Sequence, residues 1–187
     1  MKKFLTALVA SVVSLSPTGA MAGNNNIDEH QQLWDTLNNI GVKTLVNDSR
    51  YCEKDVMGLY YPYQRTLVVC QDNRSVNNGK MIDWTDNDLD TLRHEAHHVV
   101  QDCLDRNLGD GHLAVLFDGP GQLRNFYTGI LSQRQIDWIV NTYTKNGGDS
   151  EVIKLELEAF AVAQAVGPVN IANALTSNCS VRPGFSK

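Results

Sequence analysis

Residues 92–100 read LRHEAHHVV, and this stretch decides how the rest of the chain is interpreted. It contains the pattern His-Glu-x-x-His, in which His94 and His98 are four residues apart and Glu95 follows the first histidine. Residues four apart share one face of a helix, so the two imidazoles can hold one Zn²⁺ at about 2.0–2.1 Å per nitrogen. Glu95 is rotated by about 100° from His94, which places it beside the metal as a base for water.

The flanking sequence predicts a helix from about Asp86 to Leu104. Residues 83–88 offer N-cap side chains and first-turn acids, and Asn107 and Gly109 are stop signals. Apolar residues recur within it at helical spacing: Leu89, Leu92, Ala96, Val99, Val100, Cys103 and Leu104. The helix would therefore pack against a core with the histidines at its edge. The alternative is an exposed turn that carries three unrelated histidines.

A second helix, expected at 151–166 and ended by Gly167-Pro168, offers a carboxylate for the same site. Glu156 lies one turn from apolar residues, whereas Glu158 lies on a more polar stripe. A carboxylate on an apolar face is costly to bury unless a cation meets it. Glu156 is therefore favoured as the third metal ligand over Glu158. The alternative is that both glutamates are solvated on a surface helix.

These residues together resemble the zincin metallopeptidases. In that family the two histidines of the motif bind zinc and its glutamate is the general base, which gives those roles to His94, His98 and Glu95. A metzincin would have glycine and a further zinc ligand where this chain has Gln101 and Leu104, so that branch is excluded.

Within the zincins, the chain is most similar to the gluzincins, which take a third ligand from a later helix. The spacing from Glu156 to Ala159 resembles their Glu-x-x-Ala motif, although Phe160 stands where the pattern often continues with aspartate. A zincin often has a His or Tyr that stabilises the oxyanion. By composition alone, the candidates are His112, Tyr127 and Tyr143.

The N-terminus is typical of a signal peptide at residues 1–22. A basic start is followed by a short apolar run at 4–15 and by Ala20-Met21-Ala22, a signal for cleavage after Ala22. The mature chain at 23–187 is then long enough for one metallopeptidase domain and is expected to be secreted or periplasmic. The alternative is an N-terminal membrane anchor, for which the apolar run is short.

Charge and hydropathy exclude some classes of partner. The net charge is −5, and removing Lys2 and Lys3 with the signal peptide leaves 14 basic and 21 acidic side chains, a net charge of −7. An acidic chain with no basic patch argues against nucleic-acid binding. No later apolar run approaches 18 residues, so no membrane contact is expected after signal removal.

The four cysteines lie in the predicted mature part, and an even number in an exported protein indicates two disulfides. Cys52 and Cys70 flank an expected hairpin. Cys103 ends the histidine helix, and Cys179 lies after the glutamate helix. We therefore favour the pairs Cys52–Cys70 and Cys103–Cys179. A cysteine ligand to zinc, as in a peptide deformylase, is the alternative, but nothing around Cys52 or Cys70 resembles its motif.

The remaining elements predict an α+β fold: a small zincin-like domain with a short, mostly antiparallel sheet packed on the histidine helix and on the helix that carries the third ligand. Helices are expected at 28–39, 122–127 and 132–143, strands at 42–46, 58–63 and 66–70, and a loop bordering the site at 107–121. Pro62 suits an edge strand, which could pair with an extended peptide or simply be a blunted edge. His30 is expected to be solvated, and His97 to pack or to support the ligands.

The sequence thus predicts an exported zinc metallopeptidase that hydrolyses peptide bonds in a peptide or protein substrate. One Zn²⁺ per chain would be held by His94, His98 and Glu156, with Glu95 as general base. The alternative function is a zincin-like binding module that keeps the metal and cleaves nothing. The intact Glu95 favours the enzyme, because a module that only binds metal needs no base.

Overall fold

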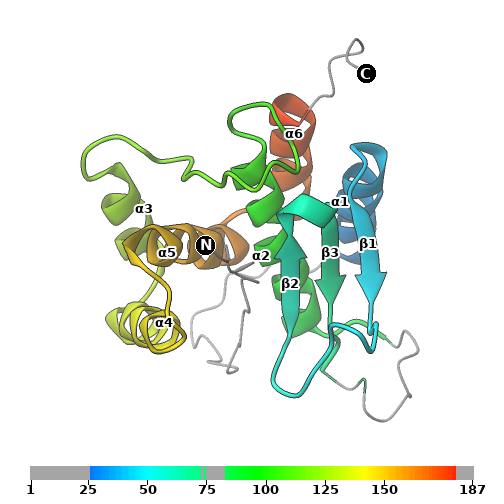
Figure 1. The fold of residues 1–187 in the computed structure, drawn as a ribbon, viewed down its shortest axis with the longest axis horizontal. Helices are drawn as coiled ribbons and strands as arrows, with labels where there is room; N and C mark the ends of the chain where they lie inside the picture. The colour runs from blue at the N-terminus through cyan, green and yellow to red at the C-terminus, as the bar shows by residue number, and fades with distance from the viewer. Residues whose placement is uncertain (1–25, 73, 75–82, 180–187) are drawn as a thin grey trace, which may run out of the picture.

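The computed structural model describes residues 26–72, 74 and 83–179, and these residues form an α+β fold of six helices and one small sheet (Figure 1). The predicted signal peptide lies outside them. In chain order the elements are α1 (Ile27–Asn39), β1 (Lys43–Val46), β2 (Gly58–Tyr61), the 3₁₀ helix η1 (Pro62–Gln64), β3 (Thr66–Val69), α2 (Asp86–Asp102), α3 (Gln122–Ile130), α4 (Gln133–Lys145), α5 (Ser150–Ala165) and α6 (Pro168–Asn178).

The sheet has three strands in the order β1-β3-β2 and is mixed, so the expectation of a mostly antiparallel sheet was wrong. β2 and β3 form the expected antiparallel hairpin, but β1 pairs with β3 in parallel. The reason is that the segment at 47–57 crosses from one edge of the sheet to the other, and β3 then returns between the two earlier strands. β2 is an edge strand and stops at Tyr61, because Pro62 has no N–H to donate and instead begins η1.

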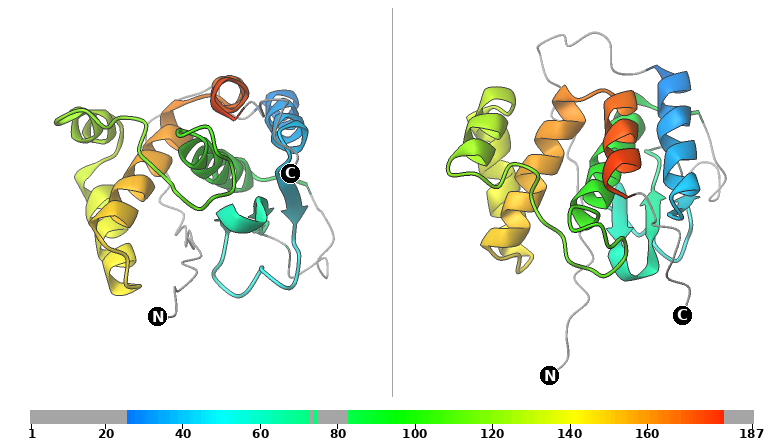
Figure 2. Two further views of the ribbon diagram at one scale, coloured as in Figure 1. Left: turned by 45° about the horizontal axis from the view of Figure 1, so that its top comes forward. Right: turned by 90° about the horizontal axis from the view of Figure 1, so that it is seen from above.

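α2 is the central helix, and it lies between the sheet and α6 (Figure 2). It begins with a capping box in which the Thr85 hydroxyl accepts from the Asp88 backbone N–H and the Asp88 carboxylate accepts from the Thr85 backbone N–H. It ends at Asp102, with Cys103 as its C-cap. Every residue from 91 to 102 is buried, because α2 is covered by the sheet on one side and by helices elsewhere.

α5 begins at an Asp149 N-cap and packs against α2, α3 and α4. The Gly167-Pro168 stop signal is confirmed for α5, but the same pair starts α6, which the sequence did not predict. Proline is favoured in the first turn of a helix, where no intrahelical partner exists for the missing N–H. α6 packs against α1 and α2 and completes the main apolar core.

Both predicted disulfides are present in the structure. Cys52–Cys70 ties the crossing segment to the end of β3, and Cys103–Cys179 joins the C-caps of α2 and α6. Two disulfides are typical of a protein that resides in an oxidising environment.

No helix in the described part of the chain has the length and apolar character that crossing a membrane requires.

The expectation that His30 is solvated was wrong, because its side chain is buried on the inner face of α1 with Leu33 and Leu37. The His30 ring bonds to the Asn26 carbonyl through Nδ1 at 2.8 Å and to Arg93 Nη1 through Nε2 at 2.7 Å.

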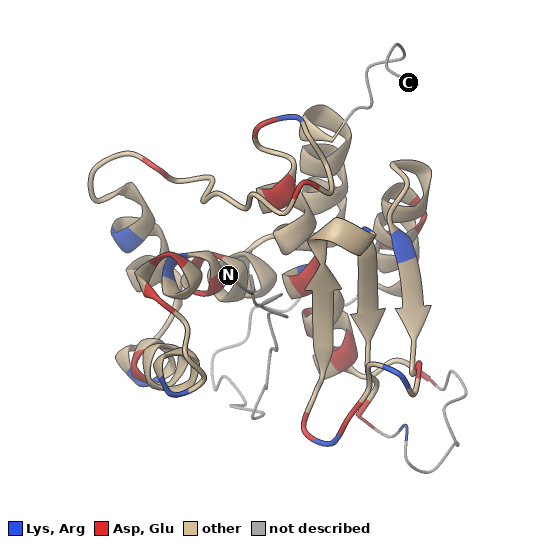
Figure 3. Cartoon of the chain, in the orientation of Figure 1, with Lys and Arg blue, Asp and Glu red and all other residues tan. Residues whose placement is uncertain are grey.

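Lys and Arg residues are spread over separate elements of the described chain (Figure 3).

Candidate metal centre

The packing of α5 against α2 brings His94, His98 and Glu156 into one buried group. The two Nε2 atoms of the histidines are 3.1 Å apart. One oxygen of Glu156 lies 3.3 Å from His94 Nε2, and the other lies 3.5 Å from His98 Nε2. None of the three side chains is more than 3% exposed. Of the two glutamates, Glu156 is therefore the one whose carboxylate faces the histidine pair.

These separations fit a metal ion in the middle of the group. Four ligand atoms placed about 2.0–2.1 Å from a zinc ion in a tetrahedron lie about 3.3–3.4 Å from one another. The two histidine nitrogens, 3.1 Å apart, and the distance from each of them to its nearer Glu156 oxygen, 3.3 and 3.5 Å, are close to that value. Two imidazole nitrogens and one carboxylate also form the donor set of a three-ligand catalytic site, which leaves a fourth position open. The group could therefore hold a metal ion.

Polar atoms without partners give a second, independent argument for a cation. Both carboxylate oxygens of Glu95 and of Glu156 are buried and have no hydrogen-bond partner among the described residues. Burial raises the pKa of Glu95 well above its usual range, and the charge of Glu156 adds to this effect. Burial also raises the pKa of Glu156. Adjacent buried carboxyls that lack partners are costly unless a cation compensates for them.

The two histidines are neutral, which is the form that binds metals. Burial lowers the pKa of His94 to about 3 and that of His98 to about 4. The His98 ring is oriented by a 2.7 Å hydrogen bond from Nδ1 to the amide oxygen of Gln101. The His94 ring instead packs against Phe160, with the ring centroids 4.4 Å apart.

Glu158 is fully buried, although it shares a stripe of α5 with the exposed Glu151 and Lys154, so the alternative that both glutamates are solvated was wrong. The reason is that α5 is covered on several sides, by α2, α3 and α4, and its buried face extends around the helix. Glu158 accepts a 2.8 Å hydrogen bond from His97 Nε2, which makes His97 a supporting residue, as expected. Burial opposes ionisation of Glu158, but the hydrogen bonds that it accepts outweigh this effect and lower its pKa.

Strand β2 passes beside Glu95. A Cβ atom on Gly58, at the start of β2, would lie 2.5 Å from Thr91 Cγ2 and 2.9 Å from both Cγ and Oε1 of Glu95. No real Cβ makes such contacts, so only glycine allows the strand to come this close to α2. An edge strand of the sheet therefore starts in direct contact with the side chain proposed to accept a proton.

Of the three candidates for an oxyanion stabiliser, the structure brings only Tyr143 to the group. Tyr143 is buried on α4, and its hydroxyl lies near the Glu156 carboxylate, although no hydrogen bond of good geometry joins the two. Burial raises its pKa, and the nearby charges of Glu156 and Glu95 raise it further. His112 is exposed in the segment after α2, and Tyr127 is partly buried against the apolar cluster that also contains Tyr143.

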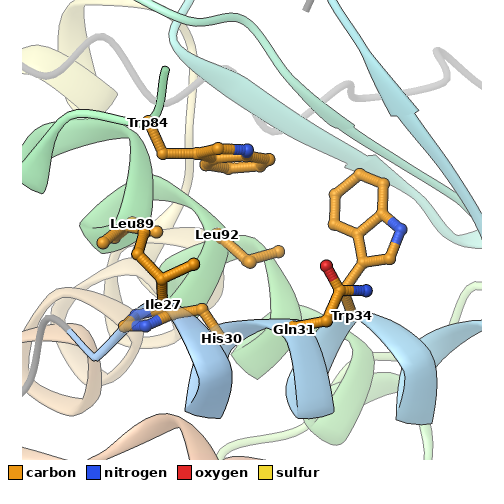
Figure 4. A pocket seen from close by; sticks show the side chains of 7 residues that line it. All are labelled: Ile27, His30, Gln31, Trp34, Trp84, Leu89 and Leu92. Carbon is orange, nitrogen blue, oxygen red and sulfur yellow. The ribbon is translucent and has the colours of Figure 1, made fainter. Parts of the chain in front are cut away.

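A pocket elsewhere on the surface contains none of these residues. It opens between α1, the start of α2 and Trp84, and Trp34 and Trp84 meet edge to face in it (Figure 4). Its lining residues are Ile27, His30, Gln31, Trp34, Trp84, Leu89 and Leu92.

Sequence reasoning missed the role of Gln101, which served only to exclude the metzincins. Its position three residues after His98 was a usable signal, because residues three apart are neighbours on a helix.

Comparison of the chain with protein families, with curated proteins and with solved structures found no match.

Proposed function

We propose that this protein is an exported zinc metallopeptidase of gluzincin type. His94, His98 and Glu156 would hold the zinc ion, and Glu95 would be the general base. The observation that carries the proposal is the buried, unpartnered Glu95 carboxylate beside a buried group of three side chains with the spacing of metal ligands. A site that only bound metal would have no use for a second buried carboxylate.

When bound, zinc would polarise a peptide carbonyl and lower the pKa of water. Glu95 would accept the proton of the attacking water and then donate it to the leaving amine, since its oxygens are not engaged by other described residues. Tyr143 is the residue we favour for hydrogen bonding to the oxyanion, because its buried hydroxyl lies beside the Glu156 carboxylate of the group.

The proposed substrate is an extended peptide. β2 is an edge strand, and among the described strands it pairs with β3 alone. An extended peptide can add to such an edge through backbone hydrogen bonds. The contact between Gly58 and Glu95 would bring the peptide backbone close to the base. The predicted signal peptide and the two disulfides support action outside the cytoplasm.

The experiment that tests the proposal combines metal analysis with a general protease assay. We expect about one zinc per mature chain, and cleavage of unfolded protein substrates that stops on chelation and returns with added zinc. Zinc binding without cleavage of any substrate would favour the binding module. A chain that contains no zinc and takes up none would contradict the proposal.

We expect Gly58→Ala to impair cleavage more than zinc binding. The added methyl group would push Thr91 and Glu95 away from β2 while leaving the three ligands in place. Such crowding costs about 1–3 kcal/mol of folding stability. Thermal unfolding, zinc affinity and cleavage rate are measured together.

The matched control is Gly129→Ala in α3, where a Cβ meets nothing within 4 Å. Equal cleavage rates in Gly58→Ala and the unmodified chain would show that the position of Glu95 does not depend on Gly58.

A further inference from the structure

Glu158 accepts hydrogen bonds from four donors on two separate parts of the chain. Oε1 accepts from His97 Nε2 at 2.8 Å, from Gln101 Nε2 at 3.0 Å and from the Leu116 backbone N–H at 3.0 Å. Oε2 accepts from the Phe117 backbone N–H at 3.1 Å. One buried carboxylate on α5 therefore holds both α2 and the segment between α2 and α3.

These contacts fix which way the Gln101 amide points. Its Nε2 donates to Glu158 Oε1 and also to the Leu155 carbonyl at 3.1 Å. Both partners can only accept, so the amide nitrogen must lie at this end. The amide oxygen is therefore the atom that lies 2.7 Å from His98 Nδ1.

The orientation of the amide in turn fixes the proton on His98. An amide oxygen can only accept, so Nδ1 of His98 must carry the hydrogen. A neutral imidazole has one N–H, and Nε2 therefore keeps a free lone pair. Nε2 is the atom that faces His94 Nε2 and Glu156. His94 has no such support, since its Nδ1 has no hydrogen-bond partner among the described residues.

The second part that Glu158 holds is the segment between α2 and α3, which runs across the molecule to α3 (Figure 1). Its backbone N–H groups at Leu116 and Phe117 point at the carboxylate. The Phe117 ring also stacks on Phe126 of α3, with the centroids 4.2 Å apart. The carboxylate therefore links the path of this segment to the orientation of a metal ligand.

We propose that Glu158 is a positioning residue of the metal centre: through Gln101 it fixes His98 with the proton on Nδ1 and Nε2 free, and it ties this arrangement to the segment at Leu116–Phe117. The inference about metal affinity rests on the proposed metal centre, whereas the inference about the proton on His98 does not. Glu158 acts through Gln101 and does not itself contact the metal ligands.

A carboxylate is required at this position because both of its oxygens accept. In Glu158→Gln, an NH₂ group would replace either Oε1 or Oε2. It would then face the Phe117 N–H, or the three donors around Oε1. An NH₂ group in place of Oε2 would leave only the Phe117 N–H without an acceptor, and one in place of Oε1 would leave His97, Gln101 and Leu116 without one. Glu158→Ala removes both oxygens and therefore releases the Gln101 amide from α5 at this contact in every case.

The first test is nitrogen-15 NMR of the histidine rings in the metal-free, otherwise unmodified mature chain at neutral pH. The chain has five histidines, and the His98 signals are identified by their loss in His98→Ala. The expected result is a proton on Nδ1 of His98. A proton on Nε2 would overturn the inference, and this measurement needs no variant that might fail to fold.

The second test compares Glu158→Ala and Gln101→Leu with Glu151→Ala, an exposed change on the same helix. In the first two, we expect the proton to shift toward Nε2 of His98 and zinc affinity to fall by about 10- to 100-fold, the usual effect of losing a partner of a metal ligand. The control should change neither. His98 signals and zinc affinity in Glu158→Ala that match the control would overturn the inference. Failure of every chain to take up zinc, with the proton on Nδ1 in the unmodified chain and shifted by Glu158→Ala, would support it and reject only the proposed metal centre.

Discussion

Replacing either histidine ligand with alanine is expected to abolish zinc binding by this protein. His94→Ala or His98→Ala removes one of three buried donor atoms, and the Glu156 carboxylate would face an incomplete site. The loss of affinity should exceed the roughly 10- to 100-fold typical of a lost supporting residue, because a direct bond to the metal disappears. Glu156→Gln should have a similar effect, since it removes the only charged ligand. Zinc content and competition with a chelator measure the loss.

The control for these variants is His112→Ala, because His112 is exposed and lies outside the group. Circular dichroism of the metal-free proteins checks that the helices are retained. Undiminished zinc content in His94→Ala and His98→Ala would mean that the metal binds elsewhere and would reject the site.

Glu95→Gln is expected to lower peptide cleavage by about 10²-fold or more while zinc stays bound. The amide has almost the same shape as the carboxylate, but it cannot take up a proton. Because Glu95 is buried and unpartnered among the described residues, the change breaks no hydrogen bond that supports the fold. Folding stability should therefore be retained or should increase, which separates loss of the base from unfolding.

The comparison variant is Glu29→Gln, an acidic residue in the first turn of α1 and away from the histidine pair. Cleavage rates, zinc content and thermal unfolding are measured for both. An unchanged cleavage rate in Glu95→Gln would show that Glu95 is not the base.

Helices α1 to α5 and both disulfides followed closely from the sequence, whereas α6 was not predicted. The capping signals at 83–88 and the apolar spacing predicted α2 within two residues at its C-terminal end. The pairs Cys52–Cys70 and Cys103–Cys179 were also predicted. These features depend on local patterns and on the order of elements along the chain. The parallel pairing of β1 with β3 depends on a crossing between distant segments, and no local pattern encodes it.

The environment of the three side chains was predicted less well than their proximity. Glu158 was assigned to a more polar stripe because its neighbours along the helix are charged. The structure buries it among donors from α2 and from the loop at 103–121. Helix phase shows which residues share a face, but it does not show how many faces of a helix are covered. For α5, that number is set by α2, α3 and α4 together.

By itself, the sequence determined which residues were proposed as the ligand pair, as the base and as the third ligand. His94, Glu95 and His98 lie within a single turn of one helix, and the position of Glu156 follows from the phase of another. Only the tertiary structure decided how these parts are supported. Gln101, Glu158 and the segment at 116–117 lie far apart in sequence, and their hydrogen bonds exist only after α5 and the loop have packed on α2. Buried polar groups must find partners wherever the fold supplies them, so their pairing is a property of the packed molecule.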